Sequence, residues 1–259
     1  MSMPSSSSSS RPVVRLKPKA NARAIRHGFP WAYDNELVTD RRTKGLVPGT
    51  LAVLEDDKRQ PLGLVATNSQ SKIFCRMLDR DPEAQVDQAW FEGKFARALA
   101  MRERLFDAPF YRLIHAEADG LPGGVVDRFG DTTVVQPNAA WAEALLEPLV
   151  AALVAVTGVS NVLKNGSGRA RGLEGLEDDS AVMVGAAPEA PVPVVMNHMR
   201  RGRRAIEGRD RGGKRKRGGE RGGGGGRRRR KKREKREREE EEEEGEKRKR
   251  SLIRVMALA

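Results

Sequence analysis

The sequence predicts an α+β protein with a small β-barrel or sandwich, a strands-helix-strands central domain and a low-complexity tail. Short runs rich in β-branched residues, separated by turn residues, predict the strands. One amphipathic segment and one almost wholly apolar segment predict the helices. An abrupt change of composition after Asn197 marks the tail. These patterns divide the chain into residues 1–12, 13–82, 83–197 and 198–259.

Residues 1–12 form a serine-rich leader that we expect to be disordered. The segment MSMPSSSSSSRP has neither the basic start nor the apolar stretch of a secretory signal. No apolar run in the chain reaches the roughly 18 residues needed to span a bilayer. The single cysteine, Cys75, excludes an intramolecular disulfide. We therefore expect a protein of the reducing cytoplasm with no membrane partner.

Residues 13–82 contain four expected strands, which are VVRL, GTLAVLE, PLGLVAT and SKIFCRML. Turn residues such as Pro48-Gly49 separate them. This close spacing of brief strands is typical of a small barrel or sandwich. Residues 20–27 predict a helical turn, and HGFPW ends it because Pro30 disfavours the α conformation at the residue before it.

A helix is predicted from Asp87 to about Phe106, and it would join the two folded parts. Aspartate at the first position can accept hydrogen bonds from the free amides of the first turn. Apolar side chains then recur at spacings of three and four residues, which places them on one face. These apolar residues are Phe91, Phe95, Ala98, Leu99, Leu105 and Phe106.

The central domain, residues 83–197, is predicted as a β-β-α-β-β arrangement. YRLIHAEADG, GGVVDRF and TTVVQP are β-rich runs whose Asp-Gly and Gly-Asp turns favour antiparallel hairpins. AAWAEALLEPLVAALVAVTG predicts a buried helix that Asn138 begins and Gly158 ends, with Pro148 kinking or restarting it. The remaining strands are expected at 159–163, 181–184 and 191–195.

Residues 198–259 cannot build a hydrophobic core. They hold 10 apolar residues among 62, no aromatic residue, 26 lysines and arginines and 12 acidic residues. They account for the net charge of +13, since residues 1–197 carry a balance of −1. We expect a disordered tail whose cations bind nucleic acid without sequence preference.

Several segments resemble one enzyme family in the expected order. HAEADGLPGGVVDRFGD, at 115–131, resembles a signature of the bacterial S-adenosylmethionine-dependent large-subunit rRNA methyltransferases that modify carbon 5 of cytosine. LKPKANARAIRHGFPWAY and SKIFCRMLDRDP are similar to the beginning and end of that family's RNA-binding PUA domain, and GRARGLEGLE to a segment of its central domain. The resemblance covers about residues 11–197. It implies a PUA-like first domain and large-subunit rRNA as the partner.

The resemblance stops at PVPVVMN, before the family's S-adenosylmethionine-binding domain. That domain needs an apolar strand leading into a glycine-rich turn, whereas the glycines from Gly218 to Gly226 lie between arginine blocks. The family's chemistry also needs a cysteine thiolate. Cys75 lies in an expected strand and is better interpreted as a small buried hydrophobe. We therefore expect no catalytic and no cofactor-binding residue in this chain.

Two functional interpretations remain open. The first is the RNA-binding and central portion of a truncated rRNA cytosine methyltransferase that is inactive alone. The alternative is a non-enzymatic RNA-binding or ribosome-associated basic protein, in which both the barrel and the tail serve binding. The residues favour the first interpretation as the evolutionary origin of the chain. They do not distinguish the two interpretations as the present activity of the protein.

The predicted RNA-binding surface lies near the start of the chain. Residues 11–44 carry nine basic and three acidic residues, a local balance of +6. Clustered cations beside aromatic rings suit a phosphate backbone with some base stacking, and the alternative is a solvated charged face. Packing within the barrel is the favoured interpretation for the tryptophan. The candidate RNA-binding residues are Arg15, Lys17, Lys19, Arg23, Arg26 and Trp31.

Five titratable residues crowd into seventeen positions: His115, Glu117, Asp119, Asp127 and Asp131. We expect structural roles for them and no metal site. Asp119 and Asp131 neighbour glycines, where aspartate closes turns through its own side chain. Asp127 is expected to pair with Arg128 or to make a domain contact. The other two histidines have no companions at metal-ligand spacing.

Overall fold

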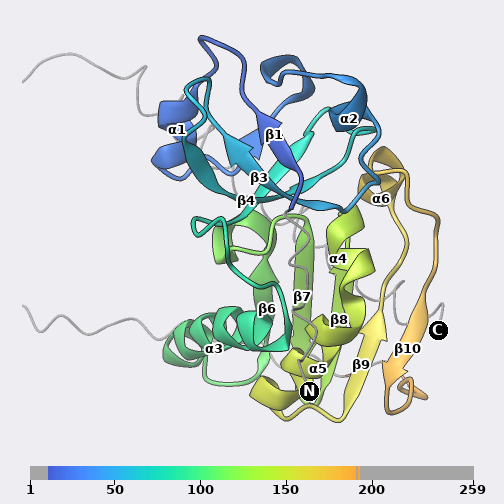
Figure 1. Ribbon diagram of the computed structural model, residues 1–259. Coiled ribbons are helices and arrows are strands. Elements are labelled where there is room, and N and C mark those ends of the chain that lie inside the picture. Colours follow the sequence, from blue (N-terminus) through green and yellow to red (C-terminus); the bar gives the residue numbers. More distant parts are fainter. Residues whose placement is uncertain (1–10, 191, 193–259) are drawn as a thin grey trace, which may run out of the picture. The chain divides into compact units, whose positions relative to one another are not determined.

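The computed structural model describes residues 11–190 and 192, which belong to one compact unit of the chain (Figure 1). This part contains two five-stranded sheets with helices, so the predicted α+β class is confirmed. The predicted leader up to residue 10, nearly all of the strand expected at 191–195 and the predicted disordered tail lie outside the described residues. No helix in the described part is long and apolar enough to cross a bilayer.

The first sheet contains the four expected strands and a fifth that the sequence did not indicate. Its strands are Val13–Arg15 (β1), Trp31–Ala32 (β2), Leu51–Glu55 (β3), Pro61–Thr67 (β4) and Cys75–Asp79 (β5). Their order is β1-β3-β4-β5-β2, with β1 and β3 parallel and the other pairs antiparallel. No ladder joins β1 to β2 within the described residues, so the predicted barrel takes the form of a curled sheet.

Short helices fill the connections of this sheet. Ala22–Arg26 (α1) falls within the predicted helical turn, and the Asn21 side chain accepts a hydrogen bond from the Ala24 amide at 3.0 Å. Two further turns, Asp34–Glu36 (η1) and Arg41–Lys44 (α2), were not predicted. They are too short to show a helical hydrophobic period, and only the Asp40 cap of α2 carries a local signal.

The helix predicted from Asp87 is confirmed as Gln88–Leu105 (α3). The Asp87 side chain accepts a hydrogen bond from the Trp90 amide at 2.9 Å, as an N-cap does. Phe91, Phe95 and Ala98 are buried along one face, whereas Leu105 is exposed. The spacing of apolar residues therefore identified the buried stripe of α3 correctly except at its end.

The second sheet has three strands before its helices, so the predicted β-β-α-β-β arrangement is wrong by one strand. Its strands are Phe110–His115 (β6), Gly124–Phe129 (β7), Thr132–Pro137 (β8), Asn161–Lys164 (β9) and Ala181–Val184 (β10). Gly120 and Gly130 adopt positive φ, so the chain reverses twice and each β-rich run forms its own strand. The order is β10-β9-β8-β7-β6, and only β8 and β9 run parallel.

The apolar segment between β8 and β9 forms two helices, Ala140–Ala144 (α4) and Leu146–Thr157 (α5). Pro148 lies in the first turn of α5, where its missing amide costs nothing, so the predicted restart is confirmed. Gly158 ends α5 with φ +65°, also as predicted. The expected start at Asn138 is wrong: Ala139 is the N-cap, because the Asn138 amide bonds to the Gly123 carbonyl.

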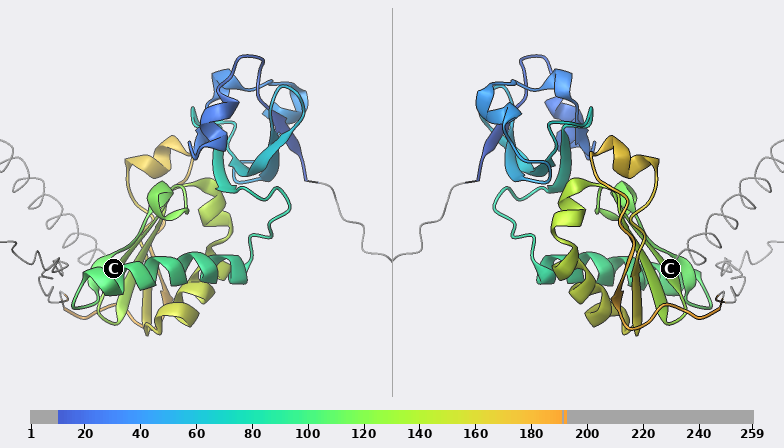
Figure 2. Two further views of the ribbon diagram at one scale, coloured as in Figure 1. Left: turned by 90° about the vertical axis from the view of Figure 1, so that its left-hand side faces the viewer. Right: turned by 90° about the vertical axis from the view of Figure 1, so that its right-hand side faces the viewer.

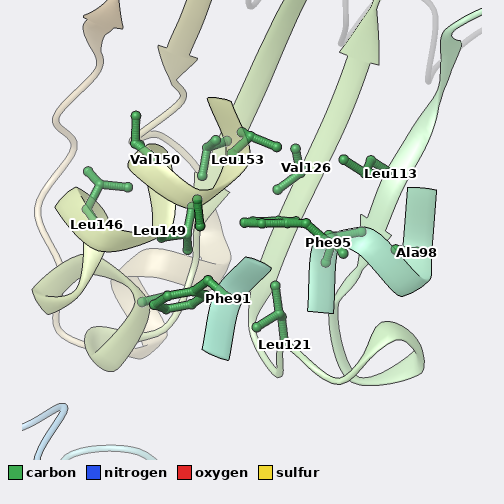
Figure 3. Packing of buried hydrophobic residues seen from close by; sticks show 14 of the residues in the cluster. Phe91, Phe95, Ala98, Leu113, Leu121, Val126, Leu146, Leu149, Val150 and Leu153 are labelled. Carbon is green, nitrogen blue, oxygen red and sulfur yellow. The ribbon is translucent and has the colours of Figure 1, made fainter. Parts of the chain in front are cut away.

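Helices α3 and α5 cover one face of the second sheet (Figure 2). Phe91 and Phe95 of α3 pack against Leu149 and Leu153 of α5 and against the strand residue Val126 (Figure 3). The Phe91 ring also stacks on the Trp141 ring of α4, with centroids 6.2 Å apart and 5° between the planes. This cluster fixes both helices to the sheet.

Candidate nucleic-acid interface

Two of the predicted RNA-binding residues present unpaired charges. Lys19 lies in the turn before α1, with φ +72°, and Arg23 lies on the exposed face of α1. Neither side chain has an ionic or hydrogen-bond partner among the described residues. Their charges are therefore free to meet a polyanion.

The other three predicted cations already have partners. Arg15 pairs with Glu55 at 3.1 Å, and Lys17 donates to the Asn35 carbonyl at 3.0 Å. Arg26 pairs with Asp56. The hydrogen bond from the Gln60 backbone amide holds the pKa of the Asp56 carboxyl below its usual value, and the hydrogen bond from Arg26 lowers it further by a smaller amount. Binding a phosphate through these cations would compete with those contacts.

The Trp31 side chain is half-buried at the edge of the first sheet. One side of it lines a tight apolar cavity with Ile25 and Met77, yet the ring belongs to neither buried core cluster. Its indole Nε1 donates a hydrogen bond to Glu117 Oε1 at 3.0 Å. Trp31 therefore contributes to the contact between the two sheets as well as to packing in the first.

A polar network, here called the junction network, connects the two sheets. It consists of Trp31, Asn68, Arg76, Glu117 and Glu174. Arg76 donates from Nη1 to Glu117 Oε1 at 3.2 Å and from Nη2 to Glu174 Oε1 at 2.7 Å. The Asn68 amide donates to the Glu174 carbonyl at 3.0 Å and to its carboxylate at 2.9 Å. Glu174 is 3% exposed, so this contact is almost dry.

The loop that presents Glu174 is itself held by buried charges. It contains the short helix Arg169–Leu173 (α6), in which Arg171 is 2% exposed. Arg171 donates to Glu143 Oε2 at 2.8 Å, to the Pro137 carbonyl at 2.6 Å and to the Glu177 carbonyl at 2.8 Å. Each of the three guanidinium nitrogens thus has an acceptor, since Nε also donates to the Glu177 carbonyl, and this offsets the cost of burying the charge.

A second cation, Lys164, adds to this loop contact. Its ammonium group binds the carboxylates of Glu143 and Asp179. The hydrogen bond and charge of Lys164 hold the pKa of Asp179 below its ordinary value. The loop is therefore fixed at both ends. The sequence carried no signal for the junction network, because the residues that form it are far apart in the chain.

The pairing expected for Asp127 is wrong. Asp127 binds Arg112 through two hydrogen bonds, at 2.8 and 3.0 Å, whereas Arg128 donates to the carbonyls of Gly130 and Thr157. Successive residues of a strand point to opposite faces, so Asp127 and Arg128 do not meet. Arg112 is the directly opposite residue on the neighbouring strand.

Of the two aspartates that we expected to close turns, Asp119 does so, whereas the Asp131 side chain binds a residue far along the chain. Asp119 accepts from Arg102 at 2.6 Å and from the His115 amide at 2.7 Å, which closes the turn. Asp131 accepts from the Ser160 amide at 3.1 Å. Within residues 11–190, no group of three or more potential metal-binding side chains occurs.

Neither of the two cavities found beside the candidate residues fits S-adenosylmethionine. A cavity beside the junction network, lined in part by Phe74 and Trp141, has room for about one water molecule. The apolar cavity beside Trp31 is tighter still. Cys75 is buried, as expected for a small hydrophobe, and this burial raises the pKa of its thiol. We therefore derive no methyl-transfer step from this part of the chain.

Comparison with protein-family models assigns the first sheet. Residues 14–80 match the model of the PUA-like domain. The segment that forms the first sheet is therefore similar to a PUA-like domain. Its residues include every candidate RNA-binding residue from Arg15 to Trp31.

Sequence comparison finds relatives among rRNA-modifying enzymes. The chain is 36% identical over 146 residues to the "Ribosomal RNA large subunit methyltransferase" of Deinococcus radiodurans, covering 53% of this chain and 35% of that protein. It is 32% identical over 182 residues to the "Ribosomal RNA large subunit methyltransferase I" of Aliivibrio fischeri, covering 69% and 46%. The chain thus spans less than half the length of these relatives. The chain is therefore similar to a part of two proteins that are named large-subunit rRNA methyltransferases.

The fold also occurs in a solved structure. A Streptococcus mutans protein described as a SAM-dependent methyltransferase superposes with a TM-score of 0.54 and 17% sequence identity. The match covers 70% of this chain and 44% of that one. At this identity the likeness establishes a shared fold over the matched part of the chain.

Replacing Glu174 with alanine should loosen the contact between the sheets. The change leaves Arg76 Nη2 without its acceptor and leaves the buried Asn68 amide with only the backbone carbonyl of residue 174. We expect it to lower the free energy of unfolding by about 2–3 kcal/mol. Urea unfolding measures this loss, and limited proteolysis should cut faster between residues 68 and 88. Glu177→Ala is the control, because that side chain is exposed. Equal proteolysis rates for both variants would contradict the prediction.

Proposed function

We propose that this chain binds large-subunit rRNA through its PUA-like domain and supplies the RNA-binding and central portion of an S-adenosylmethionine-dependent rRNA methyltransferase. We also propose residues 13–82 and 83–197 as its two folded domains, and the cytoplasm as its location. The observation that carries the proposal is the pair of free cations, Lys19 and Arg23, on a domain that matches the PUA-like family. Free cations gain affinity for RNA by releasing the counterions condensed on its phosphates.

The six candidate residues are proposed to contribute unequally. Lys19 and Arg23 have no competing contact, so we assign them the phosphate contacts. Arg15 and Arg26 are held by carboxylates, and Lys17 by a carbonyl, so they would contribute mainly to the local potential. Trp31 is proposed to lie beside the bound strand.

Reversing both free charges tests the proposal. We expect Lys19→Glu with Arg23→Glu to weaken binding of a structured rRNA hairpin at least tenfold in 100 mM salt, and to reduce the slope of log affinity against log salt by about two. Fluorescence anisotropy over a salt series measures both quantities. The control is Arg97→Glu with Arg104→Glu on α3, which changes the net charge equally and leaves the tail intact. Hairpin affinity equal to that of the control would refute the assignment.

The proposed modification is methylation of carbon 5 of cytosine, as the resemblance of residues 115–131 implies. We further propose that this chain does not transfer methyl groups alone, because the composition of residues 198–259 is too poor in apolar residues to enclose a cofactor. Incubation with labelled S-adenosylmethionine tests this part. Saturable binding by the purified chain would overturn it.

The second candidate function is a non-enzymatic, ribosome-associated RNA-binding protein, favoured by the 26 basic residues of the tail. In that case the tail would add affinity for any nucleic acid. Removing residues 198–259 would then abolish most RNA binding while the Lys19 and Arg23 reversal had little effect. The first candidate predicts instead that the Lys19 and Arg23 reversal weakens RNA binding more than the removal of residues 198–259 does.

A further inference from the structure

Three aromatic rings form a row along one extended segment of the PUA-like domain. Phe29, Trp31 and Tyr33 alternate along the chain, so their side chains fall on one side of the backbone. The ring centroids lie 5.9 Å apart from Phe29 to Trp31 and 6.4 Å apart from Trp31 to Tyr33. We call these three residues the aromatic row.

The aromatic row is not part of a hydrophobic core. None of its rings belongs to either buried cluster, and Phe29 is 40% exposed. The segment includes β2, an edge strand of the first sheet, whose one strand partner among the described residues is β5. A large ring that remains this exposed beside two others is available to a partner from solution.

Basic residues lie at both ends of the aromatic row. Arg80 donates from its side chain to the Arg26 carbonyl at 2.6 Å, which places it beside the start of the row. Lys72 accepts a hydrogen bond at its carbonyl from the Asp34 amide at 3.1 Å, which places it at the other end. The Lys72 side chain is exposed, and no partner for it occurs among the described residues.

The middle ring is held in a fixed orientation. Trp31 donates its indole N–H to Glu117, which Arg76 also binds. A ring that is already oriented loses less conformational entropy when a flat partner stacks on it. The row is therefore fixed to the junction network and adjoins the second sheet.

We propose that the aromatic row binds unpaired bases of RNA, in a single-stranded segment that continues from the phosphates held by Lys19 and Arg23. This inference rests on the proposed RNA binding and names the form of RNA that the site takes. Unpaired bases stack on aromatic rings without regard to sequence, whereas bases within a duplex are covered by their neighbours. The flanking cations favour a polyanion over an apolar peptide.

Phe29 variants and two RNA probes test the inference in the full chain. Phe29→Ala removes the exposed ring. Phe29→Leu also removes the aromatic face, but it keeps an apolar side chain at the lining of the cavity beside Trp31. The probes are a 12-nucleotide oligouridine and a 12-base-pair RNA duplex. Val38→Ala is the control, because Val38 is 41% exposed on the same domain.

We expect both Phe29 variants to lose about 5- to 100-fold in affinity for oligouridine and less than twofold for the duplex. The control should be unchanged for both probes. Oligouridine affinity within twofold of the unmodified chain, or equal losses on both probes, would overturn the inference. A different result separates the two proposals. If Lys19→Glu with Arg23→Glu reduces binding of both probes while the Phe29 variants do not, the proposed base stacking on the aromatic row is refuted and the proposed RNA binding is retained. If the unmodified chain binds neither probe, both proposals fail.

Discussion

Arg171→Ala should lower the free energy of unfolding by about 3–5 kcal/mol. The variant removes a guanidinium that is 2% exposed and leaves the carbonyls of Pro137 and Glu177 without their donors. The Glu143 carboxylate keeps only Lys164 as a partner. Deleting one member of a buried ion pair costs more than the pair itself contributes, because the groups that it bonded stay in place without their hydrogen bonds. Urea unfolding followed by circular dichroism measures the change.

Arg169→Ala is the matched control for this variant. Arg169 lies on the same short helix, is exposed and has no side-chain partner among the described residues. Its replacement should change the unfolding free energy by less than about 0.5 kcal/mol. If the two arginine variants were equally stable, the buried network would not be what holds the loop that carries Glu174.

Phe91→Ala should produce a loss of similar size, about 3–5 kcal/mol. The Phe91 side chain is fully buried, and it contacts α5 and stacks on Trp141. Removing the ring loses its transfer free energy and leaves a cavity that the surrounding helices and sheet fill only in part. Chemical unfolding gives the loss directly, and near-ultraviolet circular dichroism should report the freed Trp141 ring.

The control for Phe91 lies on the same helix. Leu105 was expected on the buried face of α3 but is 38% exposed. Leu105→Ala should therefore cost less than about 1 kcal/mol. A cost for Leu105→Ala as large as that for Phe91→Ala would mean that the buried stripe extends to the end of α3, as the spacing alone suggested.

Local signals predicted most of the regular elements. Asp87 begins α3, Gly158 ends α5 and Pro148 restarts the helix, because each acts on backbone groups within one turn of itself. The sequence missed β2, since two residues cannot show an alternating pattern. It also missed α6, because Gly168 at its cap, Gly172 within it and the lack of an apolar period leave no local sign of a helix.

The candidate site was predictable only in part. The sequence indicated a basic cluster beside an aromatic residue, but it could not separate free cations from paired ones. Arg15 meets Glu55 because of the register between β1 and β3, and Arg26 of α1 meets Asp56 because of how the helix packs on the sheet, so neither contact follows from proximity along the chain. The same limit led to the wrong partner for Asp127, which lies across the sheet at Arg112.

The sequence by itself determined the α+β class, the Asp87 cap of α3, the restart at Pro148 and the Gly158 end of α5, and the basic character of the start and end of the chain. Only the tertiary structure decided which cations remain free, that Trp31 contacts Glu117, and that Glu174 connects two sheets from more than a hundred residues away. The physical reason is the distance along the chain over which each kind of interaction acts. Propensity and capping act within a few residues, whereas ion pairs form between residues that folding brings together, and their value depends on burial that the chain order does not encode.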